Sequence, residues 1–292
     1  PGTQTAARRT AHLFGDDPLG TSWWRWSAAA RRVGESQVLK WRKLVDRPAH
    51  STLLLVTPDA RADANVDRYL GRWKGKNVED PPAPALPDPP ERAIFAYPWD
   101  GLLAEVRVSC RLPGRTAEHD AALDVFEALV GQSLYQSLRE GGSSYAPSAS
   151  VRALTPEVSV LDLHVSVPPD QAGSAVEVLL AAPGVVGAAD GTAVRWGQLV
   201  ALGANARAHA STLGHFYAVS DAIDLGMPVA ALQTYPDRVE AVDGKALAAL
   251  ADACTGHEAV TVVGGATESL APLQPTVVDW KGFAASEARA VR

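Results

Sequence analysis

An arginine and a tyrosine flank a pair of glycines near the middle of the chain, and these two side chains are the best candidates for chemistry. The segment 136–145 reads Gln-Ser-Leu-Arg-Glu-Gly-Gly-Ser-Ser-Tyr and contains Arg139 and Tyr145. A guanidinium offers a rigid fork of donors for a peptide carbonyl or carboxylate, and a phenol can donate to the oxyanion of a tetrahedral intermediate. Both therefore suit a peptide-binding cleft. The competing interpretation is structural, with an Arg bonded to the last carbonyls of a helix and a Tyr packed beneath a turn.

A long amphipathic run must position Arg139. Its apolar residues recur three or four apart, which is the spacing that lines one face of a helix. Gly141 and Gly142 follow, and glycine accepts the left-handed backbone that commonly ends a helix. The pattern therefore predicts a helix over 116–138 with Arg139 at its last turn, and a strand after Tyr145. The apolar positions are Leu123, Phe126, Val130, Leu134 and Leu138.

At these residues the chain resembles the second, non-catalytic half of the pitrilysin family, which includes insulysin and the mitochondrial processing peptidases. Family members carry a Leu-Arg-Glu, Gly, Tyr pattern at this place, usually with the Arg and Tyr one residue farther apart. The similarity continues in order along most of the chain. It includes Asp17-Pro-Leu-Gly20, the apolar segment Leu53–Val56, Tyr69-Leu-Gly-Arg-Trp73 and the segment from Tyr235 to Val242.

The resemblance implies zinc chemistry, but not in this chain. Pitrilysin-like peptidases hold zinc with an inverted His-x-x-Glu-His helix and a downstream glutamate, and the Glu of the motif activates water. Neither orientation of the motif occurs here, and no histidine has a second histidine four positions away, the spacing that places two ligands on one helix face. His257-Glu258 begins like such a motif, yet position 261 is Thr. We therefore expect no metal site in this chain and zinc in a partner half.

The composition of the chain excludes several classes of function. The chain has 292 residues and a formal net charge of −6, and no basic cluster interleaved with aromatics is visible, so nucleic-acid binding is not expected. No window is apolar enough to span a bilayer, and no signal peptide is recognisable near Pro1. The compartment is unknown, with the cytoplasm favoured. Cys110 and Cys254 lack any metal-binding or redox spacing, and we interpret them as buried thiols rather than a disulfide.

A proline-rich run divides the chain. Six prolines between Asn77 and Glu91 exclude helix and central strand, so we expect an extended linker over 77–91. Residues 1–76 would then be the C-terminal part of a first peptidase-like domain, 92–270 a second, non-catalytic domain, and 271–292 a tail. Alternating apolar residues predict strands at 104–112 and 161–167, and an apolar run predicts another at 259–263. Helical patterns occur at 35–45, 63–73, 116–138, 170–182, 192–225 and 243–254. The mixture predicts an α+β fold whose largely antiparallel sheet is covered by helices on one side.

The first unit looks incomplete. Its predicted strand, Leu53–Val56, is apolar on both faces, and one strand between two helices cannot close a sheet. Another polypeptide or an upstream segment should supply the missing strands. The cluster Trp23-Trp24-Arg25-Trp26 is either an exposed partner surface or irregular packing near the missing half, and both interpretations remain open.

These features predict the non-catalytic half, as a fragment or a subunit, of a pitrilysin-like zinc metallopeptidase. It would bind peptide substrate through Arg139 and Tyr145 and complete the active site of a partner half that carries His-x-x-Glu-His, giving a heterodimer or a longer chain. Alone, it would be inactive. One alternative is a catalytically inactive scaffold, like the core subunits of respiratory complexes. Another is a peptide-binding subunit that presents a leader segment to a different enzyme.

Overall fold

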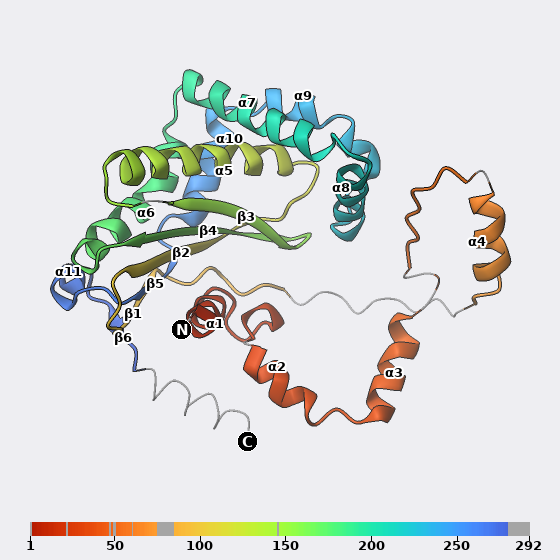
Figure 1. The fold of residues 1–292 in the computed structure, drawn as a ribbon, viewed down its shortest axis with the longest axis horizontal. Coiled ribbons are helices and arrows are strands. Elements are labelled where there is room, and N and C mark those ends of the chain that lie inside the picture. Colours follow the sequence, from red (N-terminus) through yellow and green to blue (C-terminus); the bar gives the residue numbers. More distant parts are fainter. Residues whose placement is uncertain are drawn as a thin grey trace.

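The computed structural model describes residues 2–21, 23–46, 48, 51–59, 61–74, 85–144 and 146–279. Its centre is a six-stranded sheet with strand order β3-β4-β2-β5-β1-β6 (Figure 1). The β2–β4, β2–β5 and β3–β4 pairs are antiparallel, whereas β1 pairs in parallel with both β5 and β6. The predicted α+β class with a largely antiparallel sheet is therefore confirmed. The strands are β1 Ala93–Tyr97, β2 Ala104–Pro113, β3 Ser148–Thr155, β4 Val158–Val167, β5 Ala259–Val263 and β6 Thr276–Val277.

Helices cover one face of this sheet and form the main core with it. Alternate residues of β2 and β4 point into that core, because successive side chains of a strand lie on opposite faces. The covering helices α5, α6 and α10 run across the sheet in Figure 1, with α7 and α9 outside them. The helices of this domain are α5 Asp120–Leu134, α6 Ala172–Gly187, α7 Gly191–Ala208, α8 Thr212–Asp224, α9 Tyr235–Glu240, α10 Gly244–Cys254 and α11 Thr267–Leu270.

A helix that the sequence patterns did not reveal, α1 (Gly2–Phe14), lies against the opposite face of the sheet (Figure 1). Its last two residues, Leu13 and Phe14, are fully buried against β4 and β5. Its buried Arg9 donates from Nε to Ser109 Oγ at 3.0 Å and from a terminal nitrogen to Thr261 Oγ1 at 2.7 Å. Burial lowers the pKa of Arg9 to about 10. A cation therefore lies in the middle of this interface, held by two strand hydroxyls.

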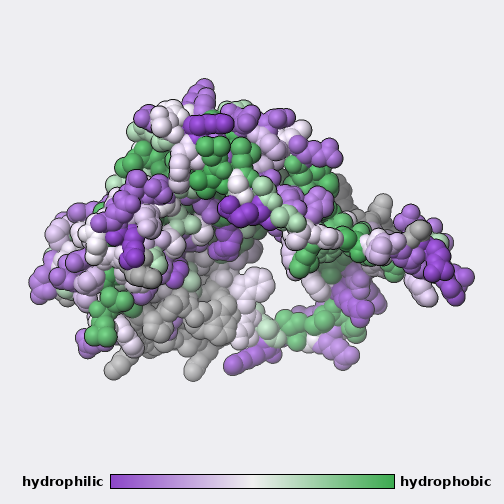
Figure 2. Space-filling model, turned by 45° about the horizontal axis from the view of Figure 1, so that its top comes forward, coloured by the Kyte–Doolittle hydropathy of each residue, from purple (hydrophilic) through white to green (hydrophobic). Residues whose placement is uncertain are grey.

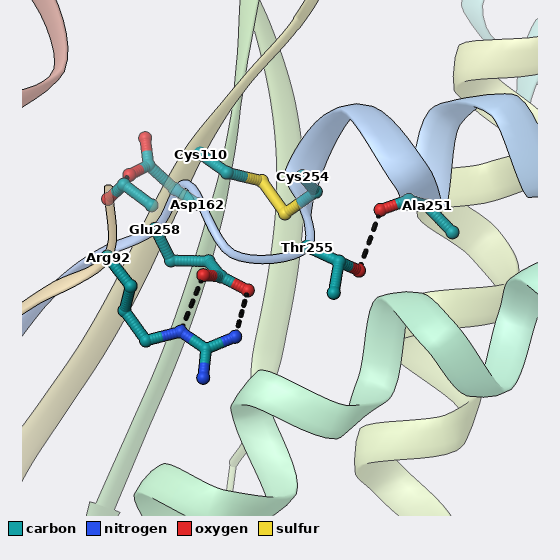
Figure 3. Close-up of a disulfide and its surroundings, with 8 residues drawn as sticks. Arg92, Cys110, Asp162, Ala251, Cys254, Thr255 and Glu258 are labelled. Carbon is teal, nitrogen blue, oxygen red and sulfur yellow. Dashed lines mark hydrogen bonds and ion pairs between the residues drawn. A yellow bond between two sulfur atoms is a disulfide. The ribbon is translucent and has the colours of Figure 1, made fainter. Parts of the chain in front are cut away.

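The two cysteines correct one prediction. Cys110 on β2 and Cys254 at the end of α10 form a disulfide, with their Cα atoms 5.2 Å apart, so the interpretation as free buried thiols was wrong (Figure 3). The sequence patterns did predict the strand that carries Cys110 and the helix that carries Cys254. Their packing across the core brings together residues separated by 144 positions, which spacing rules cannot detect.

The first unit departs from expectation at its predicted strand. The segment 51–59 forms no helix or strand, so the prediction of a strand at Leu53–Val56 was wrong. An extended segment becomes a strand only when a neighbour offers backbone partners, and no neighbouring strand lies beside it in the described part of the chain. The helices on either side were expected, and the structure has α2 Trp23–Ala30, α3 Glu35–Val45 and α4 Ala62–Leu70.

Helices α3 and α4 project away from the sheet (Figure 1) and expose large apolar side chains. Trp26, Trp41 and Tyr69 have 60%, 62% and 73% of their surfaces exposed, and Leu53, Leu55, Val56 and Trp73 are exposed as well. Figure 2 shows hydrophobic residues, in green, at the surface of this projecting segment. We call residues 26–73 the arm.

The expected helix over 192–225 is broken by a short turn. Helix α7 ends at Ala208, and Ser211 then caps α8 by accepting the N–H of Gly214 at 3.0 Å. A side chain at Gly214 would collide with the carbonyl oxygen of Ala208, so this tight reversal requires glycine. Within the described residues no single helix has the length and apolar character to cross a membrane; the pair Pro169–Gly187 and Gly191–Ala208 meets both criteria together but is bent by 101°.

Candidate functional site

Arg139 lies where the sequence pattern predicted, at the end of the long core helix, but the geometry of that end was not foreseen. The α-helix changes into a π-helix, η3 (Tyr135–Glu140), before it stops. Leu138 is buried and anchors this turn, whereas Arg139 is exposed. Gly142 has a φ of +76°, and the N–H groups of Ser143 and Ser144 both donate to the carbonyl of Leu138. π-Turns inside helices are rare and are often found at functional sites.

Tyr145, the second predicted site residue, lies outside the described residues, so its distance from Arg139 stays untested. The chain just before it is fixed, because Ser144 Oγ donates to the carbonyl oxygen of Ser166 on β4 at 2.9 Å. This bond holds the loop after η3 against the C-terminal end of β4. A rigid scaffold that positions an exposed loop is the usual arrangement for a binding site.

The loop is attached to a polar cluster on the sheet face opposite the core helices. Ser166 Oγ donates to Glu105 Oε1 at 2.7 Å, and the ring of His164 makes a short hydrogen bond to Glu105 Oε2. Burial by itself would raise the pKa of Glu105, but the hydrogen bonds from His164 and Ser166 lower it below its ordinary value. The serine bonds to the carboxylate and not to the imidazole, so this cluster lacks the serine-to-base contact that nucleophilic catalysis needs.

A second candidate site is a groove of about 1080 Å³ between α5, β3, α7 and α8. Small apolar side chains, mainly alanines, line much of it. Arg139 is not among its lining residues, so the groove and the predicted site are separate features of the described structure. The acidic side chains along the groove are Asp120, Asp124, Glu127, Asp221 and Asp224.

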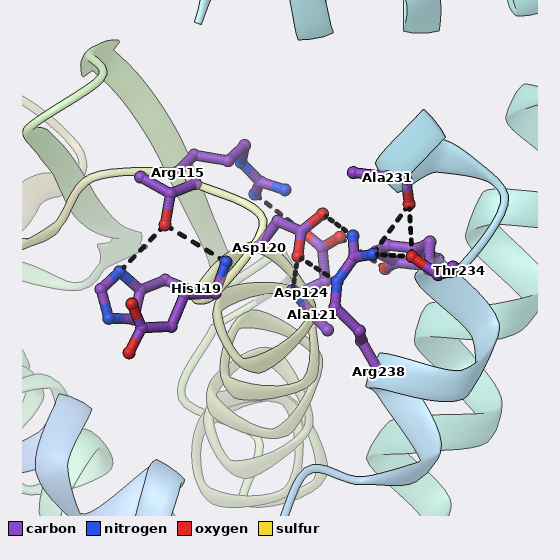
Figure 4. A network of polar contacts seen from close by, with 11 residues as sticks. Arg115, His119, Asp120, Ala121, Asp124, Ala231, Thr234 and Arg238 are labelled. Carbon is purple, nitrogen blue, oxygen red and sulfur yellow. Dashed lines mark hydrogen bonds and ion pairs between the residues drawn. The ribbon is translucent and has the colours of Figure 1, made fainter. Parts of the chain in front are cut away.

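A network of ion pairs forms the end of this groove and joins α5 to α9 (Figure 4). Arg115 contacts Asp124 at 2.7 Å, and Tyr235 donates its hydroxyl to the same carboxylate at 2.6 Å. Arg238 contacts Asp120 at 2.7 Å. Tyr235 and Arg238 lie more than 100 residues from the aspartates that they contact, so no local pattern could reveal these contacts.

The electrostatics of this network favour a structural role. Burial, followed by the neighbouring Asp124 carboxylate, raises the pKa of Tyr235 far above its ordinary value, so the phenol keeps its proton. Burial also raises the pKa of Glu127, although the N–H of Val151 donates to Glu127 at 2.8 Å and opposes the shift. Most of the charges are paired within the network, which therefore braces the fold and exposes no nucleophile.

The metal-ligating side chains of the described residues are spread over the fold. No group of three or more His, Cys, Asp and Glu side chains in the described ranges is arranged to hold a metal ion. His209 and His215 do approach each other, with their Nδ1 atoms 3.1 Å apart, but His215 is exposed and His209 is only partly buried. A peptidase zinc site needs three protein ligands and an open position, and the side chains that the structure describes do not form one.

The fold is that of an α+β domain, and comparison with known proteins identifies its family. The family model for the inactive domain of peptidase M16 matches residues 35–182, just over half of the chain. The chain therefore belongs to the M16 peptidase family and carries its inactive domain, which confirms the resemblance to the non-catalytic half. No curated protein sequence matches the chain significantly.

Several solved structures share the fold. The first half of the periplasmic protease PqqL from Escherichia coli matches with a TM-score of 0.67 and 14% identity, over 99% of this chain and 66% of that one. The M16 inactive domain from Pseudomonas fluorescens matches with a TM-score of 0.67 and 11% identity, over 91% and 66%. A chain of complex III2 from Candida albicans matches with a TM-score of 0.68 and 11% identity, over 98% and 70%. The chain thus spans slightly less than two thirds of the two bacterial structures.

Proposed function

We propose that this chain is the non-catalytic half of a pitrilysin-like zinc metallopeptidase. It binds peptide substrate and completes the active site of a partner half that carries the zinc and its His-x-x-Glu-His helix. The partner is a second polypeptide or an upstream segment of the same one. Membership of the M16 inactive-domain family supports the general assignment. The partner and the substrate are the new elements of the proposal.

The observation that carries the proposal is the exposed apolar surface of the arm. Large exposed apolar patches on soluble proteins mark interaction sites. An aromatic side chain has about 150–250 Å² to bury, at about 25 cal/mol per Å². Trp26 and Trp41 are 60% and 62% exposed as whole residues, so covering either of them would contribute roughly 2 to 4 kcal/mol. Several such residues lie on the same segment, so the energy available is that of a stable interface.

The extended segment at Leu53–Val56 suggests how the partner contacts the arm. Its backbone has no strand partner in the described structure, and its side chains are apolar on both faces. Strands from the partner half would supply backbone hydrogen bonds and cover those side chains at the same time. Association should therefore convert this segment into a strand.

The partner interface can be tested by measuring association directly. The chain is co-expressed with its neighbouring or upstream sequence, and the dissociation constant is measured for Tyr69→Ser. Tyr217→Ser is a matched control, because Tyr217 on α8 is similarly exposed, at 57% against 73%. We expect Tyr69→Ser to weaken association by roughly 30- to 1,000-fold, equivalent to about 2 to 4 kcal/mol, and the control to leave it unchanged. A stable, well-folded monomer at low micromolar concentration, with no bound partner, would contradict the proposal.

Peptide recognition is assigned to Arg139 and Tyr145. The support is the position of Arg139, which is exposed at the end of a π-helix whose following loop is fixed to the sheet. An exposed guanidinium on a rigid support loses little entropy when it binds a carbonyl or carboxylate. In the assembled enzyme this end of the domain would face the zinc of the partner half.

A second candidate function is an inactive scaffold within a larger assembly. The fold similarity to a chain of complex III2 favours it, since that match covers 98% of the present chain. The two candidates differ in one measurable property. The purified assembly either cleaves peptides in a chelator-sensitive way, as the peptidase half requires, or has no such activity.

A further inference from the structure

The disulfide in the core carries information about where this chain folds. Cys110 and Cys254 are the two cysteines of the entire sequence, and the structure joins them. Cys110 lies on β2, between the two strands that flank it in the sheet, and Cys254 is the last residue of α10. Figure 3 shows the bond between the strand and the helix end, close to the Arg92–Glu258 ion pair.

Both residues are completely inaccessible to solvent in the folded chain. Thiol–disulfide exchange proceeds by attack of a thiolate on a sulfur atom through a mixed disulfide, so it requires that an external sulfur reach the bond. In this fold β2 and α10 and their neighbours occupy the space around the two sulfurs. Neither the oxidant that makes this bond nor a reductant that breaks it can approach while the core is closed.

We propose that this chain folds in an oxidising compartment, and that the Cys110–Cys254 bond forms before the core closes. The inference is independent of the proposed function. In the reaction, the two thiols release two protons and transfer two electrons to the disulfide of a thiol oxidoreductase or of oxidised glutathione. The donor disulfide is cleaved to two thiols as the new S–S bond forms. Such bonds persist in secreted and periplasmic proteins and are rare in cytosolic ones, where thiols are kept reduced.

Burial of the two sulfurs limits where in the cell the bond can form. A chain that folded in the cytoplasm would close its core over two thiols and shield them from later oxidation. The chain must therefore reach the oxidising compartment unfolded, which differs from the cytoplasmic location favoured by the sequence alone. The bond then joins residues 144 positions apart and reduces the entropy of the unfolded chain, so it stabilises the folded domain.

The decisive experiment traps the thiols of the full chain as it occurs in the cells that make it. Cells are quenched in acid, the protein is denatured, and free thiols are alkylated with a maleimide of known mass before and after reduction. We expect no label without reduction and two labels after it. Two labels without prior reduction would show that the native chain carries free thiols and would overturn the proposal.

A second experiment tests the order of events. The purified chain is unfolded, reduced, refolded with its thiols free, and exposed to oxidised glutathione with and without a denaturant. We expect oxidation to be at least 100-fold slower without the denaturant, because the core must open first. Equal rates would refute the claim that the bond forms before the core closes.

The stability of a disulfide-free variant gives a third, independent measure. Cys110→Ala/Cys254→Ala should lower Tm by roughly 5 to 15 °C relative to the oxidised chain, from a few kcal/mol for a long loop in a domain of this size. The control is wild-type protein that is reduced while unfolded and then refolded with its thiols free, and its Tm should fall by a similar amount. An equal Tm for this reduced protein and for the oxidised chain would show that the bond does not stabilise the native fold.

Discussion

Arg92→Met should be one of the most damaging single substitutions in the second domain. Glu258 is fully buried, and its two carboxylate oxygens accept hydrogen bonds from Arg92 Nε at 2.7 Å and from a terminal nitrogen at 3.0 Å (Figure 3). Removing the guanidinium leaves a buried carboxylate without its cation, which typically costs about 3 to 5 kcal/mol. The side chain of Arg92 is 37% exposed, so water can partly replace it, and we expect a loss of about 2 to 4 kcal/mol.

Urea unfolding followed by far-ultraviolet circular dichroism measures this loss. The double variant Arg92→Met/Glu258→Met is the control, because it removes both charges and should be clearly more stable than Arg92→Met alone. Arg92→Lys keeps the charge but not the paired hydrogen bonds, so it should lie between Arg92→Met and wild type. Two results would show that the buried pair does not hold the start of β1 to the loop before β5. One is a loss of less than about 1 kcal/mol in the free energy of unfolding for Arg92→Met. The other is a double variant that is no more stable than Arg92→Met.

Three further predictions concern the site, the metal and pH. Arg139→Ala and Tyr145→Phe should each lower kcat/KM of the assembled enzyme by roughly 10- to 1,000-fold while leaving assembly unchanged, the range for losing an oriented donor; unchanged kinetics in both would return the pair to a structural role. The isolated chain should bind no stoichiometric zinc and cleave no peptide. If metal analysis found one tightly bound zinc per chain, together with chelator-sensitive peptidase activity, the assignment as the non-catalytic half would be contradicted. Because burial raises the pKa of Glu127 in the folded state, the folded chain binds the proton more tightly, so the stability that this residue contributes is present below its unfolded pKa and is lost as pH rises through the folded value. Glu127→Gln, which still accepts from Val151, should remove that part of the pH dependence in Tm measurements between about pH 4 and 7, and an unaltered profile would exclude Glu127 as its source.

The parts of the fold that follow local rules could be predicted from the sequence. Strands β2 and β4 alternate apolar and polar residues because one face is buried and the other carries polar groups. The apolar run at 259–263 matches β5 at both ends. Helix α1 was missed because its buried face includes Arg9, a charged residue that breaks the apolar pattern and is satisfied only by hydroxyls more than 90 residues away.

The helix that carries the predicted site residue Arg139 could be predicted for the same reason, whereas the role of Arg139 and Tyr145 stays a prediction. The helix that ends at Arg139 follows from the spacing of its apolar residues and from the two glycines after it. The change to a π-helix is one extra residue in the last turn, and it has no sequence signature. The network around Asp124 and Tyr235 depends on contacts between α5 and α9, and the disulfide on contacts between β2 and α10, so neither could be predicted from spacing. The domain boundaries at 77–91 remain a prediction.

The position of β5 in the sheet has a consequence for how this chain is made. The strand lies between β2 and β1, although about 145 residues separate it from β2 in the sequence. As the chain enters the compartment in which it folds, β2, β3, β4 and α5 can assemble first, whereas β1 has no neighbouring strand until residues 259–263 have followed. Arg9 of α1 also lacks one of its two hydrogen-bond acceptors until Thr261 is in place. A nascent chain that stalls before residue 259 would expose the unpaired edges of β1 and β2 together with the apolar arm, a combination that favours aggregation and binding by chaperones.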